Sequence, residues 1–159
     1  MSKVGCQNHT LRRNLTVHKP ISEVFAFFSN ASNLEAITPP FLHFRILTKS
    51  PIQMELEGRI DYALSLFGVP IRWRTRISCW EPNIRFIDEQ ESGPFAFWRH
   101  THEFISCGDD CTVVSDLVEY REPLGVLGMI AHKVFVAKVL AKIFDYRRDQ
   151  TIAFLEPQN

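Results

Sequence analysis

Apolar and polar residues alternate along most of the chain, and the pattern changes to a helical period near the C-terminal end. From residue 9 to residue 18 apolar side chains fall largely on every second position, which is typical of a strand with one buried face. From residue 124 to residue 155 they recur at three- and four-residue spacing, with no proline inside the segment. We therefore expect one long closing helix over residues 124–155.

Two short helical patterns follow the first strand. Pro20 can occupy the first turn of a helix, and residues 21–30 then carry apolar side chains at helical spacing. A second short segment over residues 31–37 ends at Pro39 and Pro40. The pattern predicts two brief helices directly after the first strand.

The middle of the chain has the pattern of strands joined by short turns. Besides residues 9–18, the alternation predicts strands over residues 42–47, 54–66, 71–79, 84–90, 95–107 and 111–121. Short turns between consecutive strands indicate an antiparallel sheet. Seven antiparallel strands with helices gathered on one side form an α+β fold.

The hairpin over residues 54–79 has the clearest pattern. Pairing Leu66 with Ile71 sets Asp61 opposite Arg76, so that apolar residues face apolar ones and an acid faces a base. The outward arginines of this hairpin therefore lie opposite carboxylates. Such a pattern is typical of a solvated sheet face rather than of a nucleic-acid surface.

Length and charge narrow the class of protein. The 159 residues contain no linker and no repeat, so we expect a single domain over residues 1–159. Basic and acidic residues number 18 each, which argues against a nucleic-acid or membrane partner bound by bulk charge. No apolar run reaches the roughly 18 residues of a membrane span, and we expect no stable membrane insertion. The sequence leaves the oligomeric state open.

The cysteines show no metal-binding or redox motif. Cys6, Cys79, Cys107 and Cys111 have no C-x-x-C spacing. We interpret all four as reduced thiols of a cytoplasmic protein. A disulfide between Cys107 and Cys111 would span a very tight turn, so we do not expect one.

Several segments together resemble one known family. They are Gly93-Pro94-Phe95 leading into residues 98–104, the alternating Thr112, Val114, Asp116, Val118 and Tyr120, then Pro123-Leu124-Gly125, and Ile143-Phe144-Asp145-Tyr146-Arg147. With the order of elements, they make residues 10–155 resemble the helix-grip fold of the SRPBCC superfamily. That superfamily includes START-type lipid-transfer domains, birch-pollen-allergen-like proteins and polyketide cyclases/dehydrases. The chain is similar to small, stand-alone bacterial ligand-binding members.

The resemblance implies a deep apolar cavity between the curved sheet and the closing helix. One helix cannot fill the concave face of seven strands, so large side chains or a ligand must occupy the space. We expect a pocket of roughly 300–1,000 Å³, entered near residues 124–129 and 39–43. The candidate ligand-binding residues are Tyr62, Trp73, Trp98, His100, His102, Phe104, Asp116, Tyr120, Leu127, Ile130 and Val134.

Two histidines of the segment 95–107 are candidates for chemistry. His100 and His102 alternate with outward residues and share one face with Trp98 and Phe104, which indicates that they point inward. One hairpin register sets His102 opposite Asp116, and a shift of two residues sets His100 there instead. The pair can be a buried structural contact, an anchor for a polar ligand group, or a general acid–base pair.

Metal binding is the weaker interpretation of the same residues. Two histidines at i and i+2 on a strand can chelate, and Asp116 can add a carboxylate. No further cysteine or histidine stands at ligand spacing. We therefore expect no metal and no cofactor.

Three functions fit these observations. We favour the binding of a small hydrophobic or amphipathic molecule by a carrier or sensor, and not an enzyme. The alternative is an enzyme similar to polyketide cyclases/dehydratases, with His100 or His102, Asp116 and Tyr62 transferring protons. The third is a protein-interaction module whose core is filled.

Overall fold

The computed structural model describes residues 8–66, 68–123 and 135–156. The bounds of its helices and strands follow the order predicted from the sequence. They are β1 His9–Val17, α1 Ile21–Phe28, α2 Asn33–Ala36, the 3₁₀ helix η1 Pro40–Leu42, β2 Arg45–Ile46, β3 Arg59–Leu66, β4 Val69–Glu81, β5 Arg85–Ser92, β6 Phe97–Gly108, β7 Cys111–Arg121 and α4 Ala137–Leu155.

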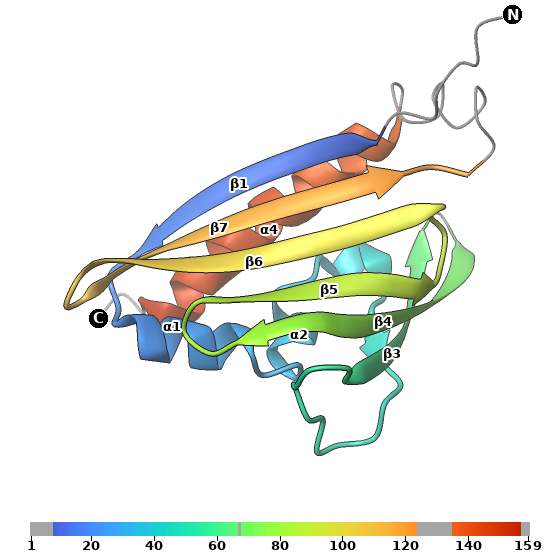
Figure 1. The fold of residues 1–159 in the computed structure, drawn as a ribbon. Helices are drawn as coiled ribbons and strands as arrows, with labels where there is room; N and C mark the ends of the chain where they lie inside the picture. Colours follow the sequence, from blue (N-terminus) through green and yellow to red (C-terminus); the bar gives the residue numbers. More distant parts are fainter. Residues whose placement is uncertain (1–7, 67, 124–134, 157–159) are drawn as a thin grey trace, which may run out of the picture.

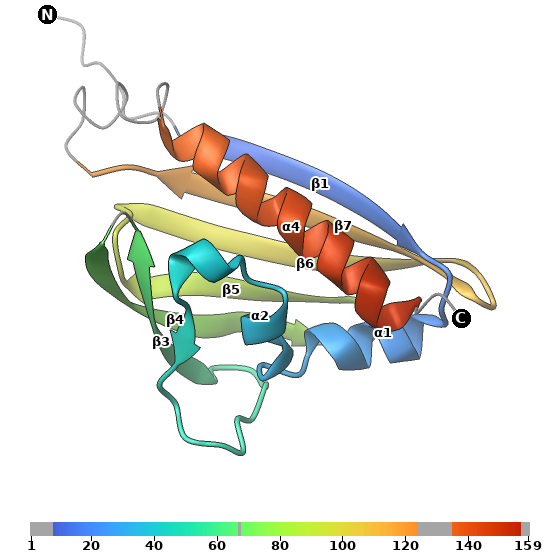
Figure 2. The same ribbon diagram turned by 180° about the vertical axis from the view of Figure 1, so that it is seen from behind.

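The strands form one antiparallel sheet in the order β1-β7-β6-β5-β4-β3-β2. Every pair of neighbouring strands is consecutive in sequence except β1 and β7. These are the first and the last strand of the chain, and they lie side by side (Figure 1). The helix α4 crosses the inner face of the sheet, and α1 and α2 lie on the same side (Figure 2). This arrangement confirms the predicted α+β class and the helix-grip fold.

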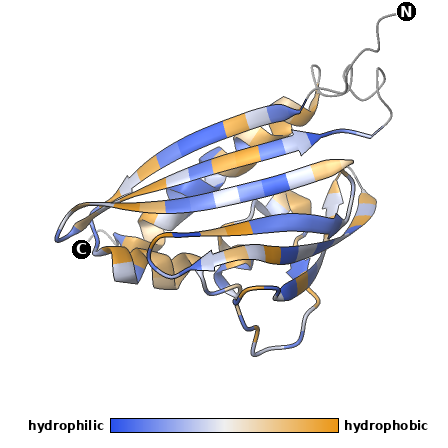
Figure 3. Cartoon of the chain, in the orientation of Figure 1, coloured by the Kyte–Doolittle hydropathy of each residue, from blue (hydrophilic) through white to orange (hydrophobic). Residues whose placement is uncertain are grey.

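Side-chain alternation explains why the sheet has one buried face. Along β7 the residues at even positions are buried and those at odd positions are half-buried. The hydropathy colouring changes from residue to residue along the strands in the same way (Figure 3). Strand geometry sends successive side chains to opposite faces, so the inner face collects the apolar residues.

Two apolar clusters attach the helices to this inner face. Phe25 of α1 packs edge-on against Phe104 of β6, with ring centroids 5.2 Å apart. Leu140 and Phe144 of α4 belong to a second cluster with Tyr120 of β7. Burying a large apolar side chain contributes about 1.5–3 kcal/mol, and these clusters hold α1 and α4 against the inner face of the sheet (Figure 2).

The predicted register of the β3–β4 hairpin was wrong by two residues. Leu66 pairs with Val69 rather than with Ile71, and Asp61 pairs with Arg74 rather than with Arg76. Only two residues separate the strands, and a turn this short needs a positive φ, which Gly68 supplies at 78°. A shift of two residues leaves every side chain on its original face, so the alternation alone does not distinguish the two registers.

The β6–β7 hairpin has the register that sets His102 opposite Asp116 and Trp98 opposite Tyr120. The expectation that Cys107 and Cys111 are reduced thiols was wrong, because the structure joins them in a disulfide. An irregularity in the ladder before Gly108 leaves their Cα atoms 5.0 Å apart, a separation that a disulfide can bridge.

The closing helix is described from Ala137, and the segment 124–134 lies outside the described residues. Three predicted ligand-binding residues, Leu127, Ile130 and Val134, therefore lie outside them too, as does the predicted entrance at residues 124–129. Among the helices that the structure describes, none is long and apolar enough to cross a membrane.

Candidate functional site

A cavity of about 420 Å³ lies between the inner face of the sheet and α4. This volume falls in the predicted range for small-molecule sites. Residues of β3 to β6 form its floor, α4 forms one wall, and α1, α2 and η1 with the loops beside them close it. The structure places five of the predicted ligand-binding residues on this wall: Tyr62, Trp73, Trp98, His100 and His102.

Three other predicted residues lie behind the cavity wall. Phe104 packs in the apolar cluster around Phe25, and Tyr120 packs edge-on against Phe95. Asp116 lies under the two histidines and borders a second, much smaller pocket between β1, β7 and α4. These three residues are not among those that line the cavity, and their roles in ligand binding stay predictions.

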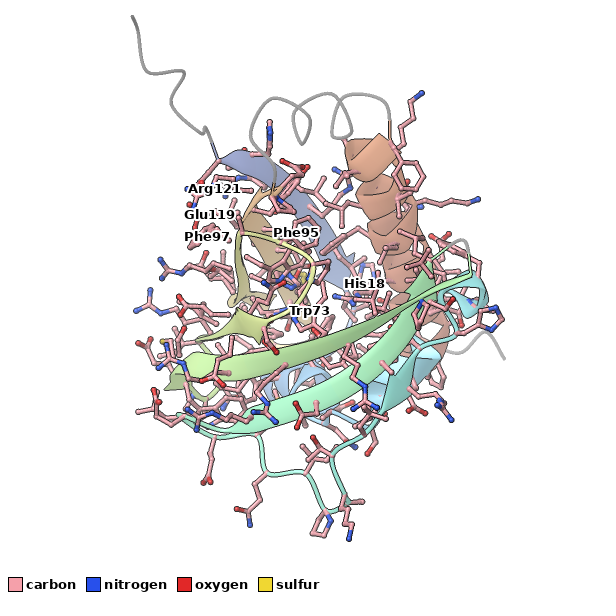
Figure 4. The ribbon with its side chains drawn as sticks, turned by 90° about the vertical axis from the view of Figure 1, so that its right-hand side faces the viewer. His18, Trp73, Phe95, Phe97, Glu119 and Arg121 are labelled. Atoms are coloured by element: carbon pink, nitrogen blue, oxygen red, sulfur yellow. A yellow bond between two sulfur atoms is a disulfide. The ribbon has the colours of Figure 1, made fainter. Side chains whose placement is uncertain are left out.

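Aromatic rings form one end of the cavity. Tyr62 and Trp73 stack with centroids 5.8 Å apart, and Trp98 meets Trp73 edge-on at 5.1 Å. Trp73 and Phe95, whose rings meet edge-on at 5.7 Å, lie toward the inner side of the sheet, whereas Phe97, Glu119 and Arg121 lie on the other side (Figure 4). Flat apolar molecules pack well against such rings.

Two histidines and two aspartates form a polar cluster, in which Asp88, His100 and His102 line the mostly apolar wall and Asp116 lies behind it. His100 Nε2 lies 2.8 Å from Asp116 Oδ1 in a hydrogen bond, and His102 Nε2 lies 3.0 Å from Asp88 Oδ2 in another. Two longer contacts close the ring, from His102 Nδ1 to Asp116 at 3.1 Å and from His100 Nδ1 to Asp88 at 3.6 Å. The contact from His102 Nδ1 to Asp116 does not have the geometry of a hydrogen bond. Asp116 thus meets both histidines, the two alternatives that the sequence left open.

Asp88 is a site residue that the sequence analysis missed. It lies on β5 opposite His100, and Thr75 Oγ1 is 3.3 Å from its second oxygen. The signal was present in the alternation, since Asp88 follows Phe86 by two residues and shares its inward face. A carboxylate on the buried face of a strand needs a partner, and the two histidines of β6 supply it.

The charges of the cluster are set by burial and by the neighbouring groups. Burial works against ionisation of Asp116 and Asp88, but the hydrogen bonds and charges of the histidines outweigh it and lower both pKa values. Burial, together with the nearby His102, lowers the pKa of His100. For His102 the two carboxylates outweigh burial and raise the pKa. Of the two histidines, His102 is therefore the one that carries a proton more readily.

Two further groups border the cluster. Burial, and secondarily Asp88, raises the pKa of Tyr62 well above its ordinary value, so its phenol is neutral and can donate a hydrogen bond but is a poor base. Arg147 of α4 lines the cavity, stacks its guanidinium on the Phe144 ring at 5.1 Å, and lowers the pKa of Asp88 through its charge. The place of Arg147 at the cavity was not predicted from the sequence, in which this residue belongs only to the segments that carry the resemblance.

The arrangement defines an α+β domain with an apolar cavity and one polar cluster in its wall. The sequence model of the family "Polyketide cyclase / dehydrase and lipid transport" matches residues 17–142, and the chain belongs to this family. The resemblance to the SRPBCC superfamily is thereby confirmed. No curated protein matches the chain in sequence.

Solved structures share the fold over nearly the whole chain. The Zhui aromatase/cyclase from Streptomyces sp. R1128 has a TM-score of 0.74 and 13% identity, covering 94% of each chain. A START superfamily protein from Mycobacterium smegmatis has a TM-score of 0.64 and 16% identity, covering 89% of this chain and 98% of that one. Norcoclaurine synthase from Thalictrum flavum, in complex with dopamine and hydroxybenzaldehyde, has a TM-score of 0.66 and 14% identity, covering 96% and 90%. At these identities the likeness shows the fold alone.

Proposed function

We propose that this protein binds a small hydrophobic or amphipathic molecule in its internal cavity, as a carrier or sensor. The observation that carries the proposal is a cavity of about 420 Å³ whose wall is predominantly apolar and includes one buried polar cluster. Transfer of apolar surface from water to such a wall yields about 25 cal/mol per Å². A ligand of this kind therefore gains affinity from burial and orientation from the cluster.

The distribution of groups favours a molecule with a flat apolar body and one polar end. The rings of Tyr62, Trp73 and Trp98 offer stacking surfaces at one part of the wall. His102 and Arg147 offer hydrogen-bond donors at another. A polar group left without such partners would cost free energy on burial, so the cluster selects where the polar end lies.

Filling the cavity tests the proposal directly. In Val139→Trp the new indole would extend from α4 into the cavity, because Val139 lines it. Lys138→Trp is the matched control, since Lys138 is the exposed neighbour on the same helix. We expect the wild type and Lys138→Trp to bind the apolar fluorophore N-phenyl-1-naphthylamine with one site, and Val139→Trp to lose that binding. Equal binding by all three folded proteins would contradict the proposal.

The His–Asp cluster supports a second candidate, a proton-transfer enzyme of the cyclase or dehydratase kind. His102 would act as the general acid and neutral His100 as the base, with Asp116 fixing both rings and Tyr62 donating a hydrogen bond to the substrate. Similarity to an aromatase/cyclase supports this candidate at the level of the fold. A His102→Gln variant that keeps fluorophore binding but loses turnover of a polyketide-like substrate would favour it over the carrier.

The remaining expectations from the sequence stay predictions. These are the cytoplasmic location, the absence of a nucleic-acid partner and the single domain over residues 1–159. The disulfide between Cys107 and Cys111 does not support the part of the cytoplasmic prediction that rested on reduced thiols.

A further inference from the structure

The His–Asp cluster also places three potential metal-ligand atoms close together. Asp88, His100 and His102 each offer one ligand atom, and these atoms lie within 4.8 Å of one another on the cavity wall. Asp88 Oδ2 is 3.0 Å from His102 Nε2 and 3.6 Å from His100 Nδ1. In a tetrahedral zinc site with bonds of about 2.0–2.1 Å, neighbouring ligand atoms are about 3.3 Å apart. These two separations from Asp88 lie on either side of that value.

Asp116 lies on the far side of both rings and explains how they are aimed. His100 Nε2 is hydrogen-bonded to Asp116, so the N–H is at Nε2 and the lone pair of Nδ1 faces Asp88. Nδ1 of His102 lies 3.1 Å from the same Asp116 oxygen and has no hydrogen-bond partner in its present orientation among the described residues. A small rotation of the His102 ring would direct an Nδ1–H at Asp116 and free Nε2 as a lone pair. Metal-binding histidines are oriented by a carboxylate in this way.

We infer that Asp88, His100 and His102 bind one divalent transition-metal ion on the wall of the cavity, with Asp116 as the carboxylate that orients both histidines. Two histidines and one carboxylate on one side of a metal leave coordination positions open, as in catalytic zinc sites and non-haem iron sites. Here the open positions face the cavity, because the three ligand residues line it and Asp116 does not.

Burial and charge at the site suit a divalent cation. The side chains of His100 and His102 are 5% and 7% exposed, and that of Asp88 is 17% exposed. Two buried carboxylates face one another across the histidine rings, and a cation between His102 Nε2 and Asp88 replaces the proton that now bridges them. With neutral histidines and Arg147 beside Asp88, the loaded site has a net positive charge. It would therefore take an anionic oxygen of a cavity ligand, such as a carboxylate or an enolate, in an open position.

Titration of the chelator-treated full chain with Co²⁺ and Zn²⁺ tests the inference. We expect Co²⁺ to saturate at one equivalent with the visible absorption of a four- or five-coordinate ion, and Zn²⁺ to displace it. Asp88→Asn and His102→Gln should each lower the affinity by more than about 100-fold, and Asp116→Asn by about 10- to 100-fold. Glu89→Gln, on the outer face of the same strand and bound to Arg76, should bind as the wild type does.

Two outcomes would overturn the inference, and neither depends on the apolar ligand. One is a wild-type protein that binds no Co²⁺ at a single site. The other is Asp88→Asn or His102→Gln binding as tightly as the wild type, which would place the metal elsewhere. If a variant does not fold, histidine-ring NMR of the wild type decides. Zn²⁺ should move the signals of His100 and His102 and leave those of His18 and His43 unchanged.

Discussion

The two faces of the same strands carry two different kinds of ionic cluster. On the inner face, Asp88 and Asp116 meet His100 and His102, whose side chains are almost fully buried. On the outer face, arginines of β3 and β4 pair with carboxylates of the sheet and of the loop before β3. The outer pairs are Arg59 with Glu91, Arg74 with Asp61, and Arg76 with Glu57 and Glu89.

The two faces differ in how exposed their ion pairs are to solvent, although both pair carboxylates with basic side chains. The Arg74–Asp61 pair has good geometry, with two nitrogen–oxygen distances of 2.7 and 3.0 Å, yet both side chains are 40% exposed or more. Water and salt compete for such a pair, and its net contribution is small. The inner cluster is largely shielded from bulk water, so the loss of one member leaves the others poorly satisfied in a lower dielectric. The outer face thus carries exposed ion pairs, and the inner face carries a buried cluster held by mutual contacts.

The largest effect is expected from Asp116→Ala. The change leaves His100 and His102 without their shared acceptor, and breaking a buried charged pair costs about 3–5 kcal/mol of unfolding free energy. Urea denaturation in the presence of a chelator measures this loss without any contribution from bound metal. Asp61→Ala is the control on the outer face. A loss for Asp116→Ala no larger than that for Asp61→Ala would remove the distinction between the faces.

A smaller loss is expected from His100→Gln. Glutamine retains a donor for Asp116 but gives up the ring contact with Phe144 and the second contact with Asp88. We expect a loss of about 1–3 kcal/mol, the cost of leaving a buried polar group partly unpaired. His18→Gln serves as the control, because His18 is exposed at the end of β1. Equal stability of His100→Gln and the wild type would show that the ring is not needed to satisfy the cluster.

A still smaller effect is expected from Arg74→Ala on the outer face. Its unfolding midpoint should lie close to that of the wild type at low salt. In 1 M salt, where the screening length falls to about 3 Å, the remaining difference should vanish. The penalty of Asp116→Ala should persist under the same conditions. A salt-insensitive effect of Arg74→Ala would mean that this arginine acts through packing.

The smallest effect is expected in the pH dependence of the Arg74–Asp61 pair on the outer face. The hydrogen bond from Arg74 holds the pKa of Asp61 below its ordinary value. Because the pKa of Asp61 is lower in the folded than in the unfolded state, its carboxylate stabilises the folded state at pH values above the ordinary pKa of about 4. This stabilisation is lost as the pH falls through the pKa of the folded state. The difference between Arg74→Ala and the wild type should therefore disappear in acid. A difference that grows in acid would contradict this sign.

Much of the fold could be predicted because alternation records which face of each strand is buried. It placed His100, His102 and Asp116 inward, but it left two β6–β7 registers open, and the structure has the one that sets His102 opposite Asp116. Alternation does not record register, and a two-residue slip in the β3–β4 hairpin went undetected for that reason. It also does not give the register of β5 against β6, so the contact between Asp88 on β5 and the histidines on β6 emerged only in the structure.

Helix α4 contributes Arg147 to the site, and this position was the hardest to predict from the sequence. Arg147 belongs to a segment with charged residues on several sides, and its place at the cavity depends on how α4 is rotated against the sheet. That rotation is fixed by the packing of Leu140 and Phe144 on β7. Helical period alone gives the apolar stripe but not the position of a charged residue at its edge.

The pairing of β1 with β7 has a consequence for the order in which the molecule assembles. His9 lies opposite Tyr120, whereas every other strand pair joins neighbours in sequence. Contacts between distant residues carry a larger loop-closure cost and form slowly. We therefore expect β1 to dock after the β3–β7 meander, so that Asp116 gains its final cover last. In pulse-labelled hydrogen exchange during refolding, amides of β5 and β6 should be protected before those of β1, and the reverse order would contradict this sequence of events.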